Sequence, residues 1–454
     1  MASRVVGLVL SLTLFVLATE RAAAVEVAVS EPAWRFAPEG ELYLDEDLRV
    51  AAEEFELSQE LRPLLRREQY DIALASIQAF PPPHSPALDL LEAQLHAILS
   101  RFDAAIEVYR RVLEAAPGSI RANAGLGTLY LLTGQERPAR DRLARALSLG
   151  ATDVQTYGQL GYLNLKLAHP WSAISAYQSA LVHEPDNPQW QQGLLTALVA
   201  SGNAGSASAL IDQLLGEAAT NVSVWQQRAR LALQQQDTDR AVASLEAALR
   251  LGDATPANRQ AAAQLHLSNG NYSRAAALLE ANVGAGEVEP ADLIRLCRWL
   301  LARDALRQAQ ALADAQWRRR AGLSAVQVSA LMTVRGDLAA ARGDAAAATA
   351  AYRRALERDA ANGQALIALA KAQRAAGALA QAAVLFQRAS ALESVRRNGL
   401  LGVAQVAVDR GDYEAALATL RDVRRAYPDE HGLDGQIDSL TNLVAAQRAE
   451  RTAQ

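Results

Sequence analysis

The feature that most constrains this sequence is a period of 34 residues. Alanine recurs at that spacing at 105, 139, 173, 207, 241, 275 and 309, and in a second phase at 348, 382 and 416. The glycines of the short turns TGQ, SGN and NGN, at 134, 202 and 270, keep the same register, and those at 343, 377 and 411 keep the second phase. Single matches are expected by chance in an alanine-rich chain, but ten in phase indicate one structural unit used repeatedly.

Two further columns share this register when units are counted from 86, 120, 154, 188, 222, 256, 290, 329, 363 and 397. The eighth position is small in every unit except one, where Leu195 stands. The twenty-fourth position is usually bulky, as at Tyr109, Tyr177 and Phe386. These two columns support the same register.

Each unit is predicted to form two helices joined at the turn glycine. Positions 4, 7, 8 and 11 of a unit fall on one face of a helix, because an α-helix repeats every 3.6 residues. Small residues at positions 8 and 20 permit the two helices to approach closely, and the bulky position 24 is expected to pack into the next unit. No unit can bury its apolar face alone, so neighbouring units must stack.

The unit 154–187 shows the pattern most fully, with Tyr157, Leu160, Gly161, Ala173, Tyr177, Ala180 and Pro185. This arrangement resembles the tetratricopeptide repeat (TPR) family, and the resemblance extends from 86 to 430. It implies an all-α fold, a right-handed superhelical solenoid of helix-turn-helix repeats, in which a concave face binds extended peptides.

The sequence around the repeats suggests a domain plan. We expect a leader at 25–53 that is partly flexible, a degenerate capping repeat at 54–85, ten repeats over 86–430, and a polar capping helix at 431–454. The step from 290 to 329 is five residues longer than the period, with the insertion near 317–328. We expect its Trp317 and Arg318–Arg320 to extend a second helix; a solvated helix end, a docking point and a bend in the solenoid are the alternatives.

The first 24 residues have the pattern of a signal peptide. A basic residue, Arg4, precedes the fourteen apolar residues Val5–Ala18, whereas a membrane-spanning helix needs about 20. Ala22–Ala24 supplies a cleavage motif, so we expect cleavage after Ala24 and a periplasmic or secreted protein without a transmembrane segment. No cysteine follows the run, which argues against a lipoprotein. An uncleaved N-terminal anchor is the alternative.

The sequence offers little for chemistry. The net charge of −5 has no basic stripe, which argues against nucleic-acid binding. The six histidines form no metal-binding motif, and we find neither a phosphate loop nor a nucleophile elbow, so no enzyme activity, metal or cofactor is predicted. The single cysteine, Cys297, occupies a small position eight and is expected to be buried.

The remaining candidate is the face opposite the buried stripe, at positions 2, 5, 9 and 12, with position 6 beside them. In four consecutive units these positions hold Gln155, Gln159, Tyr162, Gln189, Gln192, Thr196, Gln226, Gln227, Arg230, Gln260 and Gln264. Amide side chains both donate and accept hydrogen bonds, which suits a peptide backbone or the hydroxyls of a neutral polysaccharide. The alternative is that glutamine, a good helix former, only solvates an exposed helix face.

Two functions remain open at this point. The chain is expected to be a scaffold or adaptor that binds envelope proteins through its groove and assembles an envelope complex. The alternative is a polysaccharide-handling module of an exopolysaccharide export system, since periplasmic TPR proteins occur in such systems. In the TPR family, groove positions that bind a C-terminal carboxylate hold Lys, Asn and Arg, and that pattern is missing here.

Overall fold

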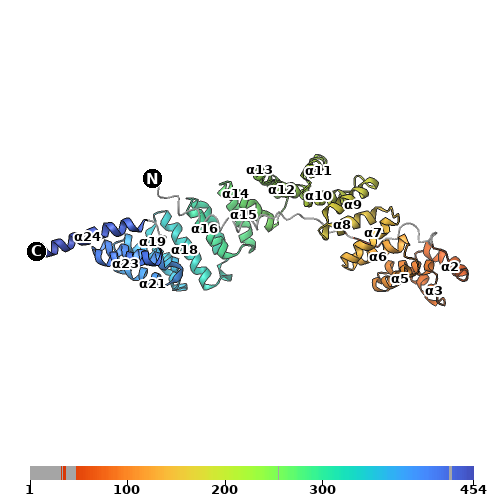
Figure 1. Ribbon diagram of the computed structural model, residues 1–454, viewed down its shortest axis with the longest axis horizontal. Helices are drawn as coiled ribbons and strands as arrows, with labels where there is room; N and C mark the ends of the chain where they lie inside the picture. Colours follow the sequence, from red (N-terminus) through yellow and green to blue (C-terminus); the bar gives the residue numbers. More distant parts are fainter. Residues whose placement is uncertain (1–31, 33, 37–47, 254, 429–431, 454) are drawn as a thin grey trace. The chain divides into compact units, whose positions relative to one another are not determined.

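The computed structural model describes residues 32, 34–36, 48–253, 255–428 and 432–453. The chain divides into two compact units, one of residues 25–253 and one of residues 254–454. Within the described residues every regular element is a helix and no strand occurs, which confirms the all-α prediction. Figure 1 shows consecutive helices paired in antiparallel hairpins, each stacked on the next within its unit.

The first unit begins with η2 and ends with α13. Its helices are η2 (Ala52–Glu54), α2 (Phe55–Arg66), α3 (Tyr70–Ala79), α4 (Pro86–Ile98), α5 (Phe102–Ala115), α6 (Ile120–Leu132), α7 (Glu136–Ser148), α8 (Val154–Lys166), α9 (Pro170–His183), α10 (Pro188–Ala200), α11 (Ala204–Glu217), α12 (Val222–Gln234) and α13 (Thr238–Arg250).

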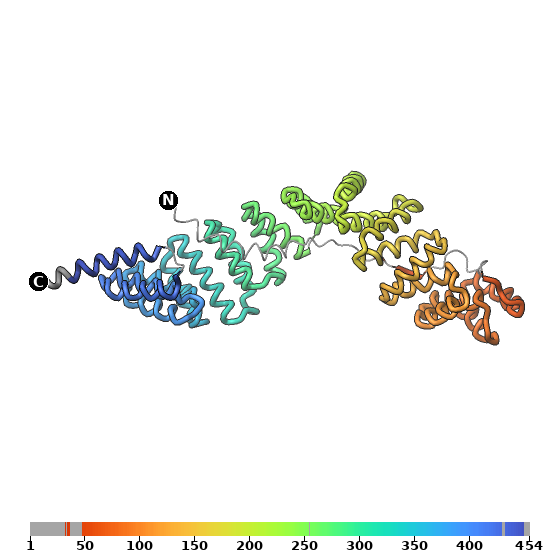
Figure 2. The backbone as a smooth tube through the Cα atoms, in the orientation of Figure 1, coloured from red at the N-terminus to blue at the C-terminus, as the bar shows by residue number. Residues whose placement is uncertain are grey.

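The second unit continues the hairpins from α14, and the backbone tube in Figure 2 follows them from green to blue. Its helices are α14 (Pro256–Ser268), α15 (Tyr272–Ala285), α16 (Pro290–Leu301), α17 (Leu306–Arg318), η3 (Arg320–Gly322), α18 (Ala325–Ala341), α19 (Ala345–Arg358), α20 (Gly363–Ala375), α21 (Leu379–Ser390), η4 (Glu393–Val395), α22 (Arg396–Asp409), α23 (Tyr413–Ala426) and α24 (Leu433–Ala453).

The turn between the two helices of each repeat has one backbone conformation throughout. The fifteenth position has a positive φ in all ten repeats, at Ser100, Gly134, Ala168, Gly202, Gln236, Gly270, Asp304, Gly343, Gly377 and Gly411. Glycine adopts this left-handed conformation without a steric penalty, which explains its recurrence there. The predicted join of the two helices at this position is therefore correct.

The small eighth position and the bulky twenty-fourth position pack together. A methyl group placed on Gly161 of α8 would lie 2.9 Å from Cζ of Tyr177 in α9. The same tyrosine also contacts Gly193 of α10, in the following repeat. Tyr109 of α5 packs in the same way against Gly125 of α6. These contacts join each repeat to the next, as the register predicts.

Cys297 of α16 is fully buried, as its position in the repeat predicts. Its Sγ lies 3.7 Å from the carbonyl oxygen of Ala309 in α17. Burial raises the pKa of the Cys297 thiol to about 12, because the thiolate would be poorly solvated. The thiol is therefore protonated at neutral pH and acts as a small apolar side chain.

The prediction that the insertion extends a second helix is wrong. Helix α17 has 13 residues, and the additional length forms η3 and the 17-residue first helix α18. The inserted arginines bind within the unit. Arg318 pairs with Glu280 at 2.9 Å, Arg319 donates to the carbonyl oxygen of Gly284 at 2.7 Å, and Arg320 lies over the ring of Trp317. These contacts tie the insertion to α15.

None of the described helices is both long and apolar enough to cross a membrane. The predicted signal peptide and its cleavage site at Ala24 lie outside the described residues, and so does most of the predicted leader. The leader residues that are described, at 32, 34–36 and from 48 onward, belong to the first unit.

Candidate functional site

A cavity of about 280 Å³ lies in the first unit, on the side predicted to form the groove. Arg121 of α6, Gln155 of α8 and Gln189 of α10, which line it, all occupy position 2 of their repeats. Gln94 of α4 and Thr128 of α6, also in the lining, occupy position 9. We call the surface that α4, α6, α8 and α10 form around this cavity the first groove.

The leader contributes Trp34, Arg35 and Phe36 to the walls of the same cavity. The Trp34 ring stacks on Trp190 of α10, with ring centroids 6.1 Å apart and planes 18° apart. It also meets the ring of Tyr162 of α8 edge-on at 5.8 Å. Such aromatic pairs contribute about 0.5–1.5 kcal/mol each beyond the burial of their area.

Phe36 and Leu48, further along the leader, pack against the apolar cluster that α4 to α8 form. The leader also coincides with an unusual feature of α4, in which every residue from Ala87 to Ala97 is buried. A helix in a solenoid normally keeps one face in solvent, so burial around the whole circumference requires a cover on the groove side. Phe36 and Leu48 contribute to this cover.

The predicted glutamine strip divides into exposed and buried members. Gln155 and Gln189 are exposed at the cavity, whereas Gln159, Gln226 and Gln227 have exposed fractions of only 3%, 1% and 0%. The idea that glutamine merely solvates an exposed face is therefore wrong for those three. Residues at positions 5 and 6 can be enclosed between neighbouring first helices. The helical periodicity of a single repeat does not reveal this burial, because it arises from contacts between repeats.

Several strip residues form hydrogen bonds from one first helix to the next. Thr128 of α6 donates to Oε1 of Gln159 of α8 at 2.9 Å, and Gln227 of α12 donates from Nε2 to Oγ1 of Thr196 of α10 at 2.9 Å. Ser223 of α12 likewise donates to Oε1 of Gln192 at 2.9 Å. These three bonds each join residues 31 apart in sequence and so stabilise the spacing of consecutive repeats.

The remaining strip residues are placed differently. Gln226 donates from Nε2 to Oδ2 of Asp253 at 3.0 Å, and half-buried Tyr162 has the Lys166 ammonium 5.5 Å from its ring centroid. Arg230 is exposed on α12. Gln260 and Gln264 are half-buried on α14, which belongs to the second unit.

The residues that sequence reasoning missed are Trp34, Phe36 and Trp190. The leader fits no repeat, so no register predicts where its side chains lie. The only signal was composition, because Trp34 and Phe36 are two aromatic residues two positions apart in a proline-containing, acidic stretch. Trp190 stands at position 3 of its repeat, outside the positions assigned to the groove.

A second cavity, of about 620 Å³, lies in the second unit between α18, α19 and α20. Thr333 and Asp337 of α18 and Lys371 of α20 line it, at positions 5 and 9 of their repeats. The Tyr352 hydroxyl donates to Oδ1 of Asp337 at 2.9 Å. Burial raises the pKa of Asp337, and this hydrogen bond offsets part of the rise. We call the surface around this cavity the second groove.

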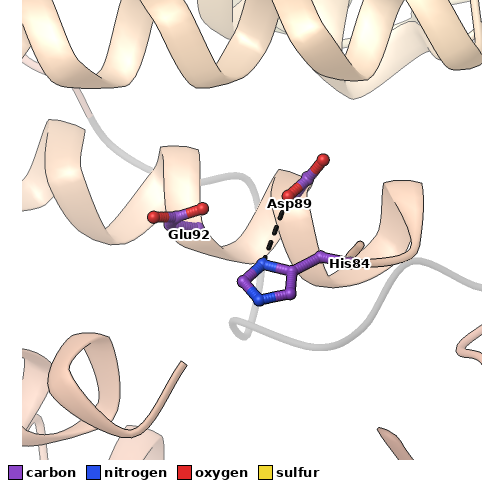
Figure 3. Close-up of side chains that lie close together, drawn as sticks. All are labelled: His84, Asp89 and Glu92. Atoms are coloured by element: carbon purple, nitrogen blue, oxygen red, sulfur yellow. Dashed lines mark ion pairs between the residues drawn. The ribbon is translucent and has the colours of Figure 1, made fainter. Parts of the chain in front are cut away.

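A third group, at the start of α4, brings together donor atoms that suit a metal ion. His84, Asp89 and Glu92 offer ligand atoms within 4.8 Å of one another, and Figure 3 shows the His84 ring turned toward Asp89. Nδ1 of His84 lies 3.5 Å from Oδ1 of Asp89. Their spacing in the sequence matches no metal motif, so sequence reasoning did not single them out.

Arg111 of α5 already compensates both carboxylates of that group. Its Nε and Nη2 donate to Asp89 at 2.9 and 2.7 Å, and Nη2 also donates to Glu92 at 2.9 Å. These bonds raise the pKa of Arg111, so its positive charge is permanent. A cation would have to displace the guanidinium, and the arrangement is best described as an ion-pair network that joins α4 to α5.

The comparisons with known families agree with the helical hairpins. Two family models, both described as tetratricopeptide repeat, match the chain, one over residues 98–160 and the other over 61–120 and 227–290. These ranges cover hairpins whose register, turn conformation and small-to-bulky packing are described above. The chain contains tetratricopeptide repeats.

Solved structures with similar helices include other TPR proteins. YrrB, titled a TPR protein with an unusual peptide-binding site, is 17% identical, with 38% of this chain and 88% of that chain covered and a TM-score of 0.36. A TPR protein from Parabacteroides merdae is 16% identical, with 50% and 91% covered and a TM-score of 0.34. Yeast Tom70 is 13% identical, with 88% and 96% covered and a TM-score of 0.34.

No curated protein matches this TPR chain in sequence.

Proposed function

We propose that this TPR protein is a non-enzymatic scaffold that binds partner proteins through its first groove. The proposal rests on the 280 Å³ cavity, which is lined by residues at positions 2 and 9 of consecutive repeats. Such a surface presents several weak contacts in a fixed order along the solenoid, which suits an extended polypeptide.

The chemistry of the lining supports a peptide ligand. Gln155 and Gln189 are exposed amides at the cavity, and each can donate to a backbone carbonyl and accept from a backbone N–H. Tyr162 adds an aromatic ring, which meets the ring of the cavity residue Trp34 edge-on. A peptide lying across these residues would therefore have both hydrogen-bonding partners and apolar contact.

We further propose that the protein works in a bacterial envelope, in the periplasm or outside the cell. The support is the N-terminal sequence, in which Arg4, the apolar run Val5–Ala18 and the motif Ala22–Ala24 follow the order of a signal peptide. The partner would then be an envelope protein, and the scaffold would assemble or support a complex there.

The test is crosslinking and capture from an envelope extract, with wild-type protein and the double variant Gln155→Ala, Gln189→Ala. We expect a stoichiometric protein partner whose affinity falls about thirtyfold in the variant, because the two lost hydrogen bonds contribute about 1 kcal/mol each. Gln178→Ala, an equally exposed glutamine on α9, is the matched control and should bind as wild type does. A partner bound equally by all three proteins, or capture of polysaccharide without a protein, would contradict the proposal.

A further inference from the structure

We propose that Trp34 and Phe36 are an intramolecular ligand of the first groove. We infer that the partner which the groove accepts is an extended peptide carrying two aromatic residues in this same spacing, and that it binds by replacing them. This inference rests on the proposed function and names the chemistry of its partner.

The contacts of Trp34 are those of a ligand in a binding site. Its ring lies between residues of two consecutive first helices, stacked on Trp190 and edge-on to Tyr162. Trp190 is itself fully buried, packs against Gly158 of α8, and is oriented by a hydrogen bond of 2.8 Å from its Nε1 to Glu184. The repeats therefore provide a rigid aromatic surface, and the leader supplies the residue that covers it.

Phe36 extends the same contact toward the start of the solenoid. Trp34 contacts α8 and α10, whereas Phe36 packs on the cluster of α4 to α8. Between them, the Arg35 side chain is exposed. Trp34 and Phe36 thus place their rings against the groove, while Arg35 borders the same cavity with its side chain open to solvent.

The contact between the leader and the first groove leaves buried polar atoms without hydrogen bonds. The Trp34 indole N–H is buried without a hydrogen-bond partner among the described residues. The same is true of Nε2 of Gln192 on α10, one of the four helices that form the first groove. The backbone N–H of Trp34 donates within the leader, to the carbonyl oxygen of Pro32 at 2.9 Å. Unpaired buried polar groups cost about 1–3 kcal/mol each.

Two consequences follow for exchange. A cavity of 280 Å³ remains beside Trp34 and Phe36, with Gln155 and Gln189 exposed in it. A longer peptide therefore has room and hydrogen-bonding groups available there. The leader is covalently attached, however, and its effective concentration at the groove is on the order of millimolar. A free peptide must compete with the leader for the groove. Its apparent Kd is therefore the intrinsic Kd divided by the fraction of molecules in which the groove is open.

The experiment measures binding of a fluorescein-labelled peptide of residues 30–38, SEPAWRFAP, to the full chain by fluorescence polarisation. We expect the variant Trp34→Ala, Phe36→Ala to bind the peptide about tenfold or more tightly than wild type, because its groove is open. A peptide in which alanine replaces the tryptophan should not bind this variant. Equal affinity of wild type and variant, or no binding of the natural peptide to the variant, would overturn the inference.

Two controls separate exchange from a loss of structure. Trp171→Ala removes an exposed tryptophan from α9, away from the groove residues, and should leave peptide binding at the wild-type level. Circular dichroism verifies the fold of the double variant. If that variant does not fold, Phe36→Ala alone leaves the Trp34 stack in place and should give a smaller increase in affinity in the same direction; no increase would overturn the inference.

The result can also be told apart from failure of the proposed function. If the peptide does not bind the opened chain while envelope-partner capture still depends on Gln155 and Gln189, the inference fails and the proposed function stands. The opposite result is that the peptide binds the Trp34→Ala, Phe36→Ala chain, and that adding Tyr162→Ala to this chain lowers the peptide affinity. If, in addition, capture of an envelope partner does not depend on Gln155 and Gln189, the inference stands and the proposed function fails.

Discussion

The first and second grooves lie at equivalent repeat positions in separate units of the chain. Positions 2, 5 and 9 of consecutive first helices line both cavities. In the first groove these positions hold amides beside an aromatic contact, and leader residues Trp34 and Phe36 lie against it. In the second groove they hold Asp337, Lys371 and the apolar Ile367, and no leader residue is among the residues that line the cavity.

The difference teaches that the repeat determines where a groove lies but not what it binds. The positions that face the cavity follow from helix geometry and are the same in both units. The chemistry at those positions varies from repeat to repeat, with amides in the first groove and the ionisable Asp337 and Lys371 in the second. The predictions that follow test which features the two units share and which belong to one of them.

The largest effect is expected where both units share the contact of a small residue with an aromatic ring. Gly161→Leu would drive a side chain into Tyr177, and Gly336→Leu would drive one into Tyr352. We expect each to lower the free energy of unfolding by about 1–3 kcal/mol through overpacking. Urea denaturation followed by circular dichroism measures this.

Gly205→Leu is the control for these substitutions, since nothing lies within 4 Å of a side chain added at that helical glycine. It should cost much less than the other two. An equal loss of stability at all three positions would show that the effect does not arise from the packing of position 8 against position 24.

A smaller effect is expected at the left-handed turns, where both units mix glycine with other residues. The first unit has Ser100, Ala168 and Gln236 at three of these turns, and the second unit has Asp304 at one. Ala168→Gly should stabilise the fold by about 0.5–1 kcal/mol and Gly202→Ala should destabilise it by about 1–2 kcal/mol, because a left-handed conformation is costly for a residue with a Cβ. Thermal unfolding measures the stability of both variants. If both substitutions stabilise the fold, or both destabilise it, the left-handed conformation does not determine stability at these turns.

The smallest effect concerns pH and belongs to the second groove alone. Burial raises the pKa of Asp337 above its ordinary value of 3.8. The folded state therefore binds this proton more tightly than the unfolded chain does, and stability is lost as pH rises through the raised folded-state pKa. Asp337→Asn, which cannot ionise, should be more stable than wild type at pH 7, and the difference should disappear well below pH 3.8.

Tyr352→Phe changes the same pH dependence in the opposite direction. It removes the hydrogen bond that lowers the pKa of Asp337 and should therefore enlarge the loss of stability between acid and neutral pH. Denaturation midpoints at several pH values measure both variants. A pH dependence that neither substitution alters would show that Asp337 does not contribute to it.

Much of the fold could be predicted from the sequence because repeat geometry is local. The period of 34 residues, the join of the two helices at position 15 and the burial of Cys297 were each predicted from the repeat pattern. The candidate site was predicted only in part. Gln155, Gln159 and Gln189 line the cavity, but only Gln155 and Gln189 are exposed there. Gln159, Gln226 and Gln227 are buried.

The sequence by itself determined the repeat, its helical hairpins and the positions that face a groove, since these depend on helical periodicity and on side-chain size. Only the tertiary structure decided that Trp34 lies against Tyr162 and Trp190, more than a hundred residues further along the chain. The physical reason is that the leader follows no period. Its position depends on which surface buries its aromatic rings, and that surface exists only once the repeats have stacked.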